Sequence, residues 1–147
     1  MKALCLAALF AVAGSGSAQS PADEPAIVAV VNGVFDGMRK ADSASVRLLF
    51  HPRARLITVD ARRTAPEIEE SADAFIRFIG TARREVLDER ISNVRVLIDG
   101  AMASAWAEYR LYSGTRFIHC GVDHFLLVKE DGKWSIMELA DTRRTDC

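Results

Sequence analysis

The chain has 147 residues, half of which are apolar, and its 19 Lys and Arg residues nearly balance its 20 Asp and Glu residues. A chain of this length can bury one hydrophobic core of ordinary size but not two, so we expect a single domain. No basic run is interleaved with aromatic residues, which argues against a nucleic-acid partner. The mixed charges of residues 82–90, "ARREVLDER", indicate a solvated face.

The N-terminus has the pattern of an export signal. A positive start is followed by an apolar run over residues 3–13, and small residues lead to Ala18. The run is well short of the roughly 20 apolar residues that cross a bilayer. We therefore expect a signal peptide over residues 1–18 and a secreted or periplasmic domain over residues 19–147, with no membrane contact after the signal is removed.

Two cysteines, Cys120 and Cys147, remain in the expected mature chain, in a compartment where disulfides persist. A bridge requires their Cα atoms to lie within about 7 Å, and a buried free cysteine is also a common core residue. A disulfide and two free thiols both fit the sequence. We expect neither cysteine to be needed for activity.

Helices come first along the chain. Apolar spacing of one helical face predicts a helix over residues 25–40. A short second helix is expected to start at Asp42 or Ser43 and to end before His51-Pro52, because the residue before proline avoids the α region. A third is expected to start at Ser71 or Asp73.

Strands follow the helices. Residues 55–60 alternate as a short strand, and residues 61–70 are interpreted as a loop. Four longer runs then alternate with period two, separated by Asp-Gly or Ser-Gly turns; they cover residues 91–98, 102–112, 116–128 and 134–143. Helices followed by a long antiparallel meander predict an α+β fold.

The last strands, "HCGVDHFLLVKEDGKWSIMELADTRR", resemble the nuclear transport factor 2-like superfamily, which includes ketosteroid isomerases, scytalone dehydratase and SnoaL-like polyketide cyclases. They look most like its small secreted members described as putative lumazine-binding proteins. The resemblance implies a cone-shaped fold, with N-terminal helices packed in a curved, mainly antiparallel sheet. It also implies a small-molecule pocket between helices and sheet, and a homodimer formed through the sheet.

Alternation within residues 102–112 separates the two faces of one strand. Ala103, Ala105 and Ala107 share a face with Tyr109, whereas the opposite face carries charged side chains that need water. The alanine face is therefore expected to point inward. Three small side chains in a row predict a hollow behind them.

A three-residue loop from Ser113 to Thr115 would pair Tyr109 with His119, and Ala105 with Asp123. The expected site then consists of two groups. The candidate catalytic residues are His119 and Asp123, and the candidate ligand-binding residues are Tyr109, Phe117, Phe125 and Ala105.

His119 and Asp123 lie about 13 Å apart along one strand, too far to bind the same metal ion. Cys120 and His124 fail for the same reason, and no other cluster has ligand spacing. We therefore predict neither a metal nor another cofactor.

Asp123 lies in the motif "VDHF", which resembles the strand motif of the oxyanion-binding aspartate in ketosteroid isomerases. A carboxyl group in an apolar pocket can stay protonated and donate a hydrogen bond. The alternative is a structural acceptor bonded to the backbone or to an arginine. Alignment places Val34 and Thr58 where that family has its tyrosine and general base, so steroid isomerisation by that route is not expected, and binding is favoured.

His119 can act as an acid or base near neutral pH, with Tyr109 orienting it; alternatively it is a sheet histidine bonded to Tyr109 or Asp141. The outer face is expected to carry an apolar patch that a second copy covers. Its members are Trp106, Ile118, Val122, Leu126 and Val128.

The predicted function is a secreted or periplasmic protein that binds a small hydrophobic or carbonyl-containing ligand in an apolar pocket. The alternative is a cofactor-free isomerase, dehydratase or cyclase that uses His119 and Asp123 as an acid–base pair. A third class, a structural interaction protein, would need no hollow.

Overall fold

The computed structural model describes residues 23–69, 71–81 and 85–147. The signal peptide expected over residues 1–18 lies outside this part. The elements are α1 (Asp23–Lys40), α2 (Ser43–Arg47), β1 (Phe50–Asp60), β2 (Glu67–Glu69), α3 (Asp73–Ile79), β3 (Leu87–Asp99), β4 (Met102–Ser113), β5 (Arg116–Glu130) and β6 (Lys133–Arg143). None of the described helices is long and apolar enough to cross a membrane.

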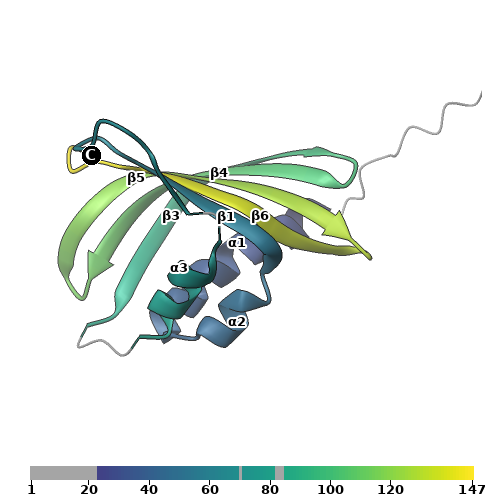
Figure 1. Cartoon of the computed structure of the whole chain (residues 1–147), viewed down its shortest axis with the longest axis horizontal. Helices are drawn as coiled ribbons and strands as arrows, with labels where there is room; N and C mark the ends of the chain where they lie inside the picture. The colour runs from purple at the N-terminus through teal and green to yellow at the C-terminus, as the bar shows by residue number, and fades with distance from the viewer. Residues whose placement is uncertain (1–22, 70, 82–84) are drawn as a thin grey trace, which may run out of the picture.

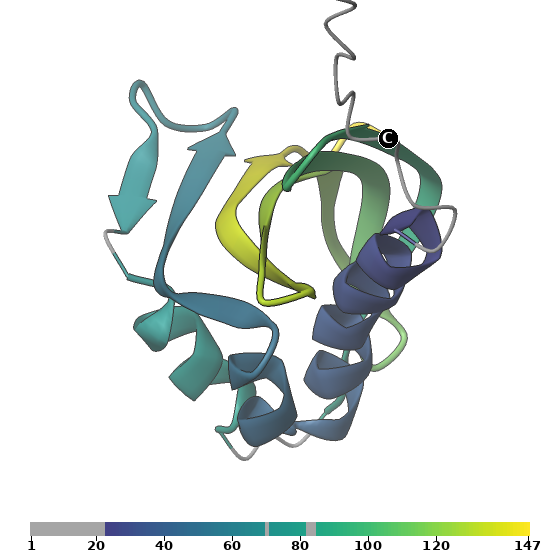
Figure 2. The same cartoon turned by 90° about the vertical axis from the view of Figure 1, so that its right-hand side faces the viewer.

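The strands form one sheet in the order β2-β1-β6-β5-β4-β3. Neighbours are antiparallel except β1 and β6, which are parallel. The helices lie on one side of this sheet (Figure 1), and the sheet curls over α1 (Figure 2). The α+β cone fold expected from the sequence is confirmed.

α1 packs into the concave side of the sheet through a continuous apolar stripe. Ile27, Val31 and Val34, spaced by three or four residues, are fully buried. Its first residue, Asp23, accepts hydrogen bonds from the Lys129 ammonium at 2.6 Å and the Trp134 indole at 3.2 Å. The start of the helix is therefore held at the hairpin that joins β5 to β6.

The two short helices begin where capping residues predict. Asp42 accepts from the Ser45 backbone N–H at 3.0 Å at the start of α2, and Ser71 accepts from the Asp73 N–H at 3.1 Å before α3. The expected end of α2 at His51-Pro52 is wrong, since α2 ends at Arg47 and β1 already includes both residues. Pro52 is tolerated because the pairing of β1 with β6 is irregular there.

Two further boundaries differ from the prediction. The loop expected over residues 61–70 contains the short strand β2, paired with β1 at Ile57 and Ile68. β3 begins at Leu87 rather than Ile91, so Glu89 belongs to the sheet. For Glu89 the solvated-face interpretation is wrong, since its side chain is buried.

The turn between β4 and β5 is one residue tighter than expected. Ser113 pairs with Arg116, and Leu111 then pairs with His119 after an irregularity that leaves Ile118 unpaired. Beyond it, Ala107 pairs with Asp123, and Ala105 with Phe125. The expected partners of His119 and Asp123 are therefore wrong by two residues.

The two-residue shift preserves the faces of most of β5, because side chains alternate with period two. Phe117 is the exception: it pairs with Tyr112, and their rings lie 5.8 Å apart. Ile118, expected on the outer face, instead lines the interior cavity.

The alanine stripe faces inward as expected, with Ala103, Ala105 and Ala107 buried. The main cavity does not lie behind the stripe: none of the three alanines lines it, and Ala103 and Ala105 belong to the packed hydrophobic core. Phe125, beside Ala105, meets the ring of Phe35 from α1 edge-on at 6.1 Å. The open space lies farther along β4, beyond Tyr109.

Candidate functional site

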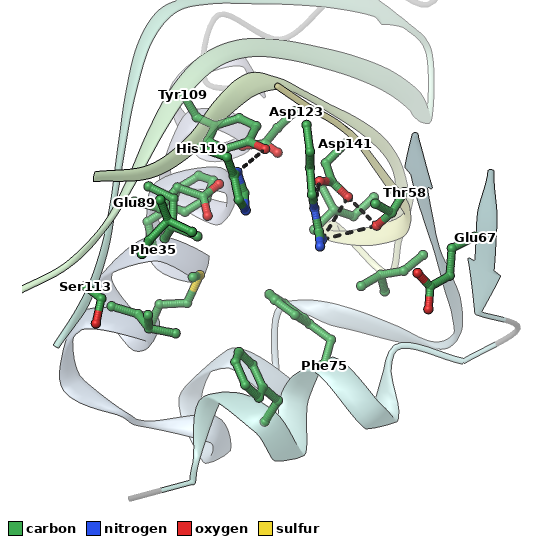
Figure 3. A pocket seen from close by; sticks show the side chains of 18 of the residues that line it. Phe35, Thr58, Glu67, Phe75, Glu89, Tyr109, Ser113, His119, Asp123 and Asp141 are labelled. Carbon is green, nitrogen blue, oxygen red and sulfur yellow. Dashed lines mark hydrogen bonds and ion pairs between the residues drawn. The ribbon is translucent and has the colours of Figure 1, made fainter. Parts of the chain in front are cut away.

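A cavity of about 570 Å³ lies between α1, α3 and the concave face of the sheet. Its volume is in the range of small-molecule sites. The lining residues come from all parts of the fold (Figure 3); they are Phe35, Met38, Leu56, Thr58, Glu67, Glu69, Ala74, Phe75, Phe78, Leu87, Glu89, Tyr109, Leu111, Ser113, Arg116, Ile118, His119, Asp123, Leu139, Asp141 and Arg143.

The helical side of the cavity is apolar. Phe35 and Met38 extend from α1, and Phe75 and Phe78 extend from α3. In Figure 3, Phe75 points up into the cavity, toward the polar side chains of the sheet. The helices therefore provide contact area for an apolar body, and the sheet provides polar groups.

Two carboxyl groups are buried together in the sheet wall. Glu89 on β3 and Asp123 on β5 both face the cavity, and only 9% and 2% of their surfaces are exposed. The two side chains are hydrogen-bonded to each other, which requires one of them to hold a proton. The Oδ2 atom of Asp123 is buried and receives no hydrogen bond from an N–H or hydroxyl group of the described residues.

Burial raises the pKa of both groups, because a low-dielectric wall disfavours the charged form. Desolvation raises the pKa of Glu89 to about 7. The pKa of Asp123 is raised well above its ordinary value by burial and then by repulsion from Glu89. Near neutral pH, Asp123 therefore stays protonated and donates a hydrogen bond to the Glu89 carboxylate.

Tyr109 and His119 form a second polar pair on the same wall. The Tyr109 hydroxyl donates to the Thr142 carbonyl at 2.8 Å and lies 3.0 Å from Nδ1 of His119. Since the hydroxyl proton is used toward Thr142, Nδ1–H of His119 must be the donor to the tyrosine oxygen. Burial lowers the pKa of His119, and Arg143 lowers it further, which favours the neutral ring. Its Nε2 then carries a lone pair.

Gly121 makes this arrangement possible. It pairs with Tyr109 across β4 and β5, and a Cβ atom added there would lie 1.8 Å from the Thr142 carbonyl oxygen. The absent side chain thus lets the end of β6 cross close over β5. The Thr142 hydroxyl also accepts from the Val122 N–H at 3.0 Å, which holds the crossing in place.

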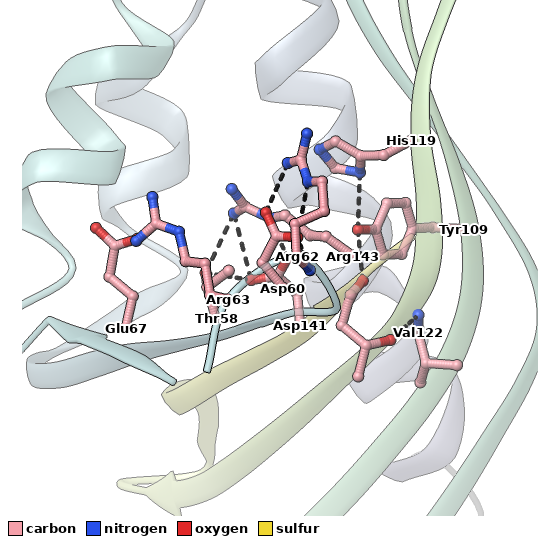
Figure 4. Close-up of polar contacts among 11 residues, drawn as sticks. Thr58, Asp60, Arg62, Arg63, Glu67, Tyr109, His119, Val122, Asp141 and Arg143 are labelled. Atoms are coloured by element: carbon pink, nitrogen blue, oxygen red, sulfur yellow. Dashed lines mark hydrogen bonds and ion pairs between the residues drawn. The ribbon is translucent and has the colours of Figure 1, made fainter. Parts of the chain in front are cut away.

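A third polar group lies where β1 meets β6. Thr58 donates to Asp141 at 2.6 Å, and Arg143 donates to Asp141 at 2.6 Å and to Thr58 at 3.2 Å. Figure 4 shows this group beside the ion pair of Asp60 and Arg62. The hydroxyl group of Thr58 cannot act as a general base near neutral pH.

The structure brings together Tyr109, His119 and Asp123 among the residues predicted for the site, as lining of one cavity. Phe117, Phe125 and Ala105 are not among its lining residues: Phe117 contacts Tyr112, whereas the other two are fully buried in the core. The roles proposed for all six stay predictions.

Glu89 is the functional candidate that the sequence prediction missed. The alternation of Leu87, Glu89 and Ile91 continues the inward face of β3 and could have revealed it. Among the described residues, no group of three or more His, Cys, Asp or Glu side chains is arranged to hold a metal ion.

A disulfide joins Cys120 and Cys147, whose Cα atoms lie 6.4 Å apart. Of the two possibilities that the sequence left open, the structure has the bridge. The isolated pairing of Cys120 with Arg144 brings the C-terminal segment alongside β5. Neither cysteine lines the cavity between helices and sheet.

The fold and the cavity define a protein of the nuclear transport factor 2-like class. Within it, residues 22–139 match the family described as "Putative lumazine-binding", and the chain belongs to that family. A comparison with curated proteins finds no match.

Solved structures share the fold at low identity. A nuclear transport factor 2-like protein of unknown function from Shewanella baltica OS155 has a TM-score of 0.67 and 22% identity, over 87% of this chain and 99% of its own. A putative scytalone dehydratase from Novosphingobium aromaticivorans has a TM-score of 0.68 and 14% identity, over 84% and 85%. A putative dehydratase from Streptomyces avermitilis has a TM-score of 0.67 and 12% identity, over 83% and 96%.

Proposed function

We propose that this protein binds a small molecule in the cavity between α1, α3 and the sheet. The observation that carries the proposal is the division of that cavity into an apolar helical wall and a polar sheet wall. Such a site buries an apolar body and orients it through a few polar groups. The family to which the chain belongs supports the same class of function.

Native mass spectrometry of protein purified from its source cells tests the proposal. The expected result is a retained small molecule, released on denaturation, whose mass indicates its class. Ala74→Trp places a large ring in the cavity from an exposed helix position and should abolish retention. Arg77→Trp adds the same ring outside the cavity, on the same helix, and should leave retention unchanged. Equal retention in both variants would contradict the proposal.

A second candidate is a cofactor-free isomerase, dehydratase or cyclase. The observation that favours it is that a neutral His119, able to accept a proton, and a protonated Asp123, able to donate one, line the same cavity. Two structural neighbours are described as dehydratases, which supports a reaction of that kind on this fold.

This candidate predicts proton exchange at the carbon between the carbonyl and the double bond of a small β,γ-unsaturated ketone. The exchange is measured by NMR in deuterated water. His119→Asn should slow it by about a hundredfold or more. Exchange no faster than in buffer, for a series of such ketones, would exclude the isomerase form of this candidate.

We further propose that the protein is exported from the cytoplasm. Residues 1–18 have the signal pattern, and the Cys120–Cys147 disulfide suits an oxidising compartment. Fractionation of source cells should recover the protein outside the cytoplasm, with an N-terminus at Gln19. Recovery of the uncleaved chain in the cytoplasm would refute export.

A further inference from the structure

The wall of the cavity carries more acidic than basic side chains. Among the described residues that line it, five have carboxyl groups and two have guanidinium groups. Burial lowers the pKa of His119, so its ring adds no positive charge near neutral pH. In Figure 3 the labelled carboxyl groups lie around the open space above Phe75. The acidic lining residues are Glu67, Glu69, Glu89, Asp123 and Asp141, and the basic ones are Arg116 and Arg143.

Ion pairs compensate two of the five carboxyl groups. Asp141 lies 2.6 Å from the Arg143 guanidinium, and Glu67 lies 2.6 Å from that of Arg63. The other three have no Lys, Arg or His nitrogen within 4.0 Å in the part of the chain that the structure describes; they are Glu69, Glu89 and Asp123. The wall therefore holds negative charge that the described residues do not neutralise.

Part of this charge is buried. Glu89 and Asp123 are bonded through one shared proton, so the pair carries one negative charge when Glu89 is ionised. Glu89 is the less deeply buried of the two and lines the cavity. Arg39 of α1 donates to the Glu89 backbone carbonyl at 3.1 Å and to Asp88 at 3.3 Å, and not to the Glu89 carboxylate. A buried charge without a counter-ion is costly, and a cation in the cavity would offset that cost.

The helical wall opposite suits the apolar part of a cation. Phe35 and Phe75 line it, and each ring is held by an edge-on contact at 6.1 Å, with Phe125 and Phe50 respectively. The face of an aromatic ring attracts a cation. Since no three His, Cys, Asp or Glu side chains of the described residues are arranged to hold a metal ion, an organic cation fits this cavity better than a metal.

We propose that the ligand is an organic cation with an apolar body, held between the phenylalanine rings of the helices and the uncompensated carboxyl groups Glu69 and Glu89. This inference rests on the proposed function and narrows it. A carbonyl group, expected from the sequence, would place a further oxygen acceptor beside these carboxyl groups. A quaternary or protonated nitrogen supplies the opposite charge instead.

Three probes with one ring system and different charges test the inference: N-methylquinolinium, 1-methylnaphthalene and 1-naphthoate. The first is a cation at every pH, the second has the same shape without a charge, and the third is an anion. Titrations are made at about pH 8, above the pKa of about 7 of Glu89. We expect the cation to bind at least about tenfold more tightly than the hydrocarbon, and the anion to bind most weakly.

Variants locate the preference. Glu89→Gln alone would allow Asp123 to ionise in its place, so Glu89→Gln is combined with Asp123→Asn, which removes the charge of the pair and keeps its shape. We expect the double variant to bind the cation about tenfold more weakly and the hydrocarbon as before. Glu108→Gln removes one carboxylate from the opposite face of β4, where it bonds Asn93, and should leave all three affinities unchanged.

A thermal melt checks that each variant is folded. Should the double variant not fold, Glu69→Gln makes the same test on the half-buried edge strand β2, outside the packed core. It should weaken binding of the cation several-fold and leave the hydrocarbon unaffected. A preference for the cation that is undiminished in the folded variants would overturn the assignment to these carboxyl groups.

The outcomes separate the inference from the proposed function. If the hydrocarbon binds as tightly as the cation and Ala74→Trp blocks both, the cavity binds ligands but the inference is overturned. If no probe binds, the molecule retained in native mass spectrometry decides: a cation supports the inference, and a neutral or acidic molecule overturns it. If no probe binds and no molecule is retained, the proposed function fails as well.

Discussion

At the scale of single residues, the chemistry of the cavity depends on which groups hold protons. Glu89 and Asp123 lie in one wall where little water can screen their repulsion, so the pair keeps a proton near neutral pH. On the same wall, the Tyr109 hydroxyl donates to the Thr142 carbonyl and therefore accepts from Nδ1–H of His119, which fixes the tautomer of the imidazole. Substitutions that conserve side-chain size at these four residues should therefore change the hydrogen bonding of the cavity wall without changing the shape of the cavity.

The buried pair makes stability depend on pH. The pKa of Glu89 is raised to about 7 in the folded chain, above its ordinary value of 4.5, so the folded state holds this proton more tightly than the unfolded state. Its contribution to stability is therefore present below about pH 4.5 and is lost as pH rises to about 7. The loss is on the order of 3 kcal/mol.

Glu89→Gln removes this titration and keeps a group that can bond Asp123. We expect the variant to be more stable than wild type above pH 7, by roughly 1–3 kcal/mol, and to have a flatter profile between pH 4.5 and 7. Urea denaturation at several pH values measures this. Glu108→Gln, at an exposed carboxylate, should keep the wild-type slope. Asp141 and Arg143, which also act on Glu89, are unchanged in both variants.

At the scale of elements, the site depends on how closely β6 crosses β5. The crossing is possible because Gly121 has no side chain to meet the Thr142 carbonyl, and it places the acceptor of the Tyr109 hydroxyl. Between β4 and β5, the irregularity at Ile118 turns that residue into the cavity. Both are local departures from regular pairing, and both shape the cavity wall.

Gly121→Ala should therefore be costly. The added methyl group meets backbone, which cannot rotate away, so we expect a loss of roughly 2–4 kcal/mol in the free energy of unfolding. Gly100→Ala is the matched control: nothing lies within 4 Å of its added Cβ, and only its φ of +58° opposes the change. Its cost should stay near 1–2 kcal/mol. Equal losses in the two variants would show that the crossing tolerates a side chain.

The disulfide between Cys120 and Cys147 closes a loop with a sequence separation of 27. Replacing both cysteines with serine should lower stability by about 3 kcal/mol, mainly because the unfolded chain gains freedom. Ligand retention should persist in the folded variant, since neither cysteine lines the cavity. Native mass spectrometry below the melting temperature measures it. Lost retention in a folded double variant would show that the C-terminal segment shapes the site.

At the scale of the whole molecule, the outer face of the sheet is the surface that a second copy would cover. Trp106 is 41% exposed there and its ring lies 6.2 Å from that of His124. Leu97 and Met102 are also exposed on the neighbouring ends of β3 and β4. An exposed apolar surface of this kind favours association.

We predict a homodimer that buries Trp106. Sedimentation of the purified protein at tens of micromolar should give the mass of two chains, and Trp106→Glu should give the mass of one. Leu48→Glu is the control, because Leu48 is 67% exposed at the end of α2, on the side of the helices. A wild-type monomer would refute both the interface and its location.

Much of this fold could be predicted because its signals are local. Asp42 caps α2, and Ser71, just before α3, accepts from the Asp73 N–H; both bonds join residues two or three positions apart, so short sequence patterns reveal them. The inward face of β4 follows from the alternation of small and charged side chains over a few residues. For the same reason the faces of His119 and Asp123 were predicted despite a wrong register.

The features that only the tertiary structure decided depend on contacts between residues distant in sequence. The burial of Glu89 follows from the concave sheet that brings Asp123 beside it, and the disulfide requires Cys147 to return to β5. The place of the cavity follows from the close packing of α1 on the alanine stripe. The sequence by itself determined the order of the elements and most of their faces, because those depend on neighbours along the chain. The register, the cavity and the proton-sharing pair were decided by packing between residues that no short pattern links.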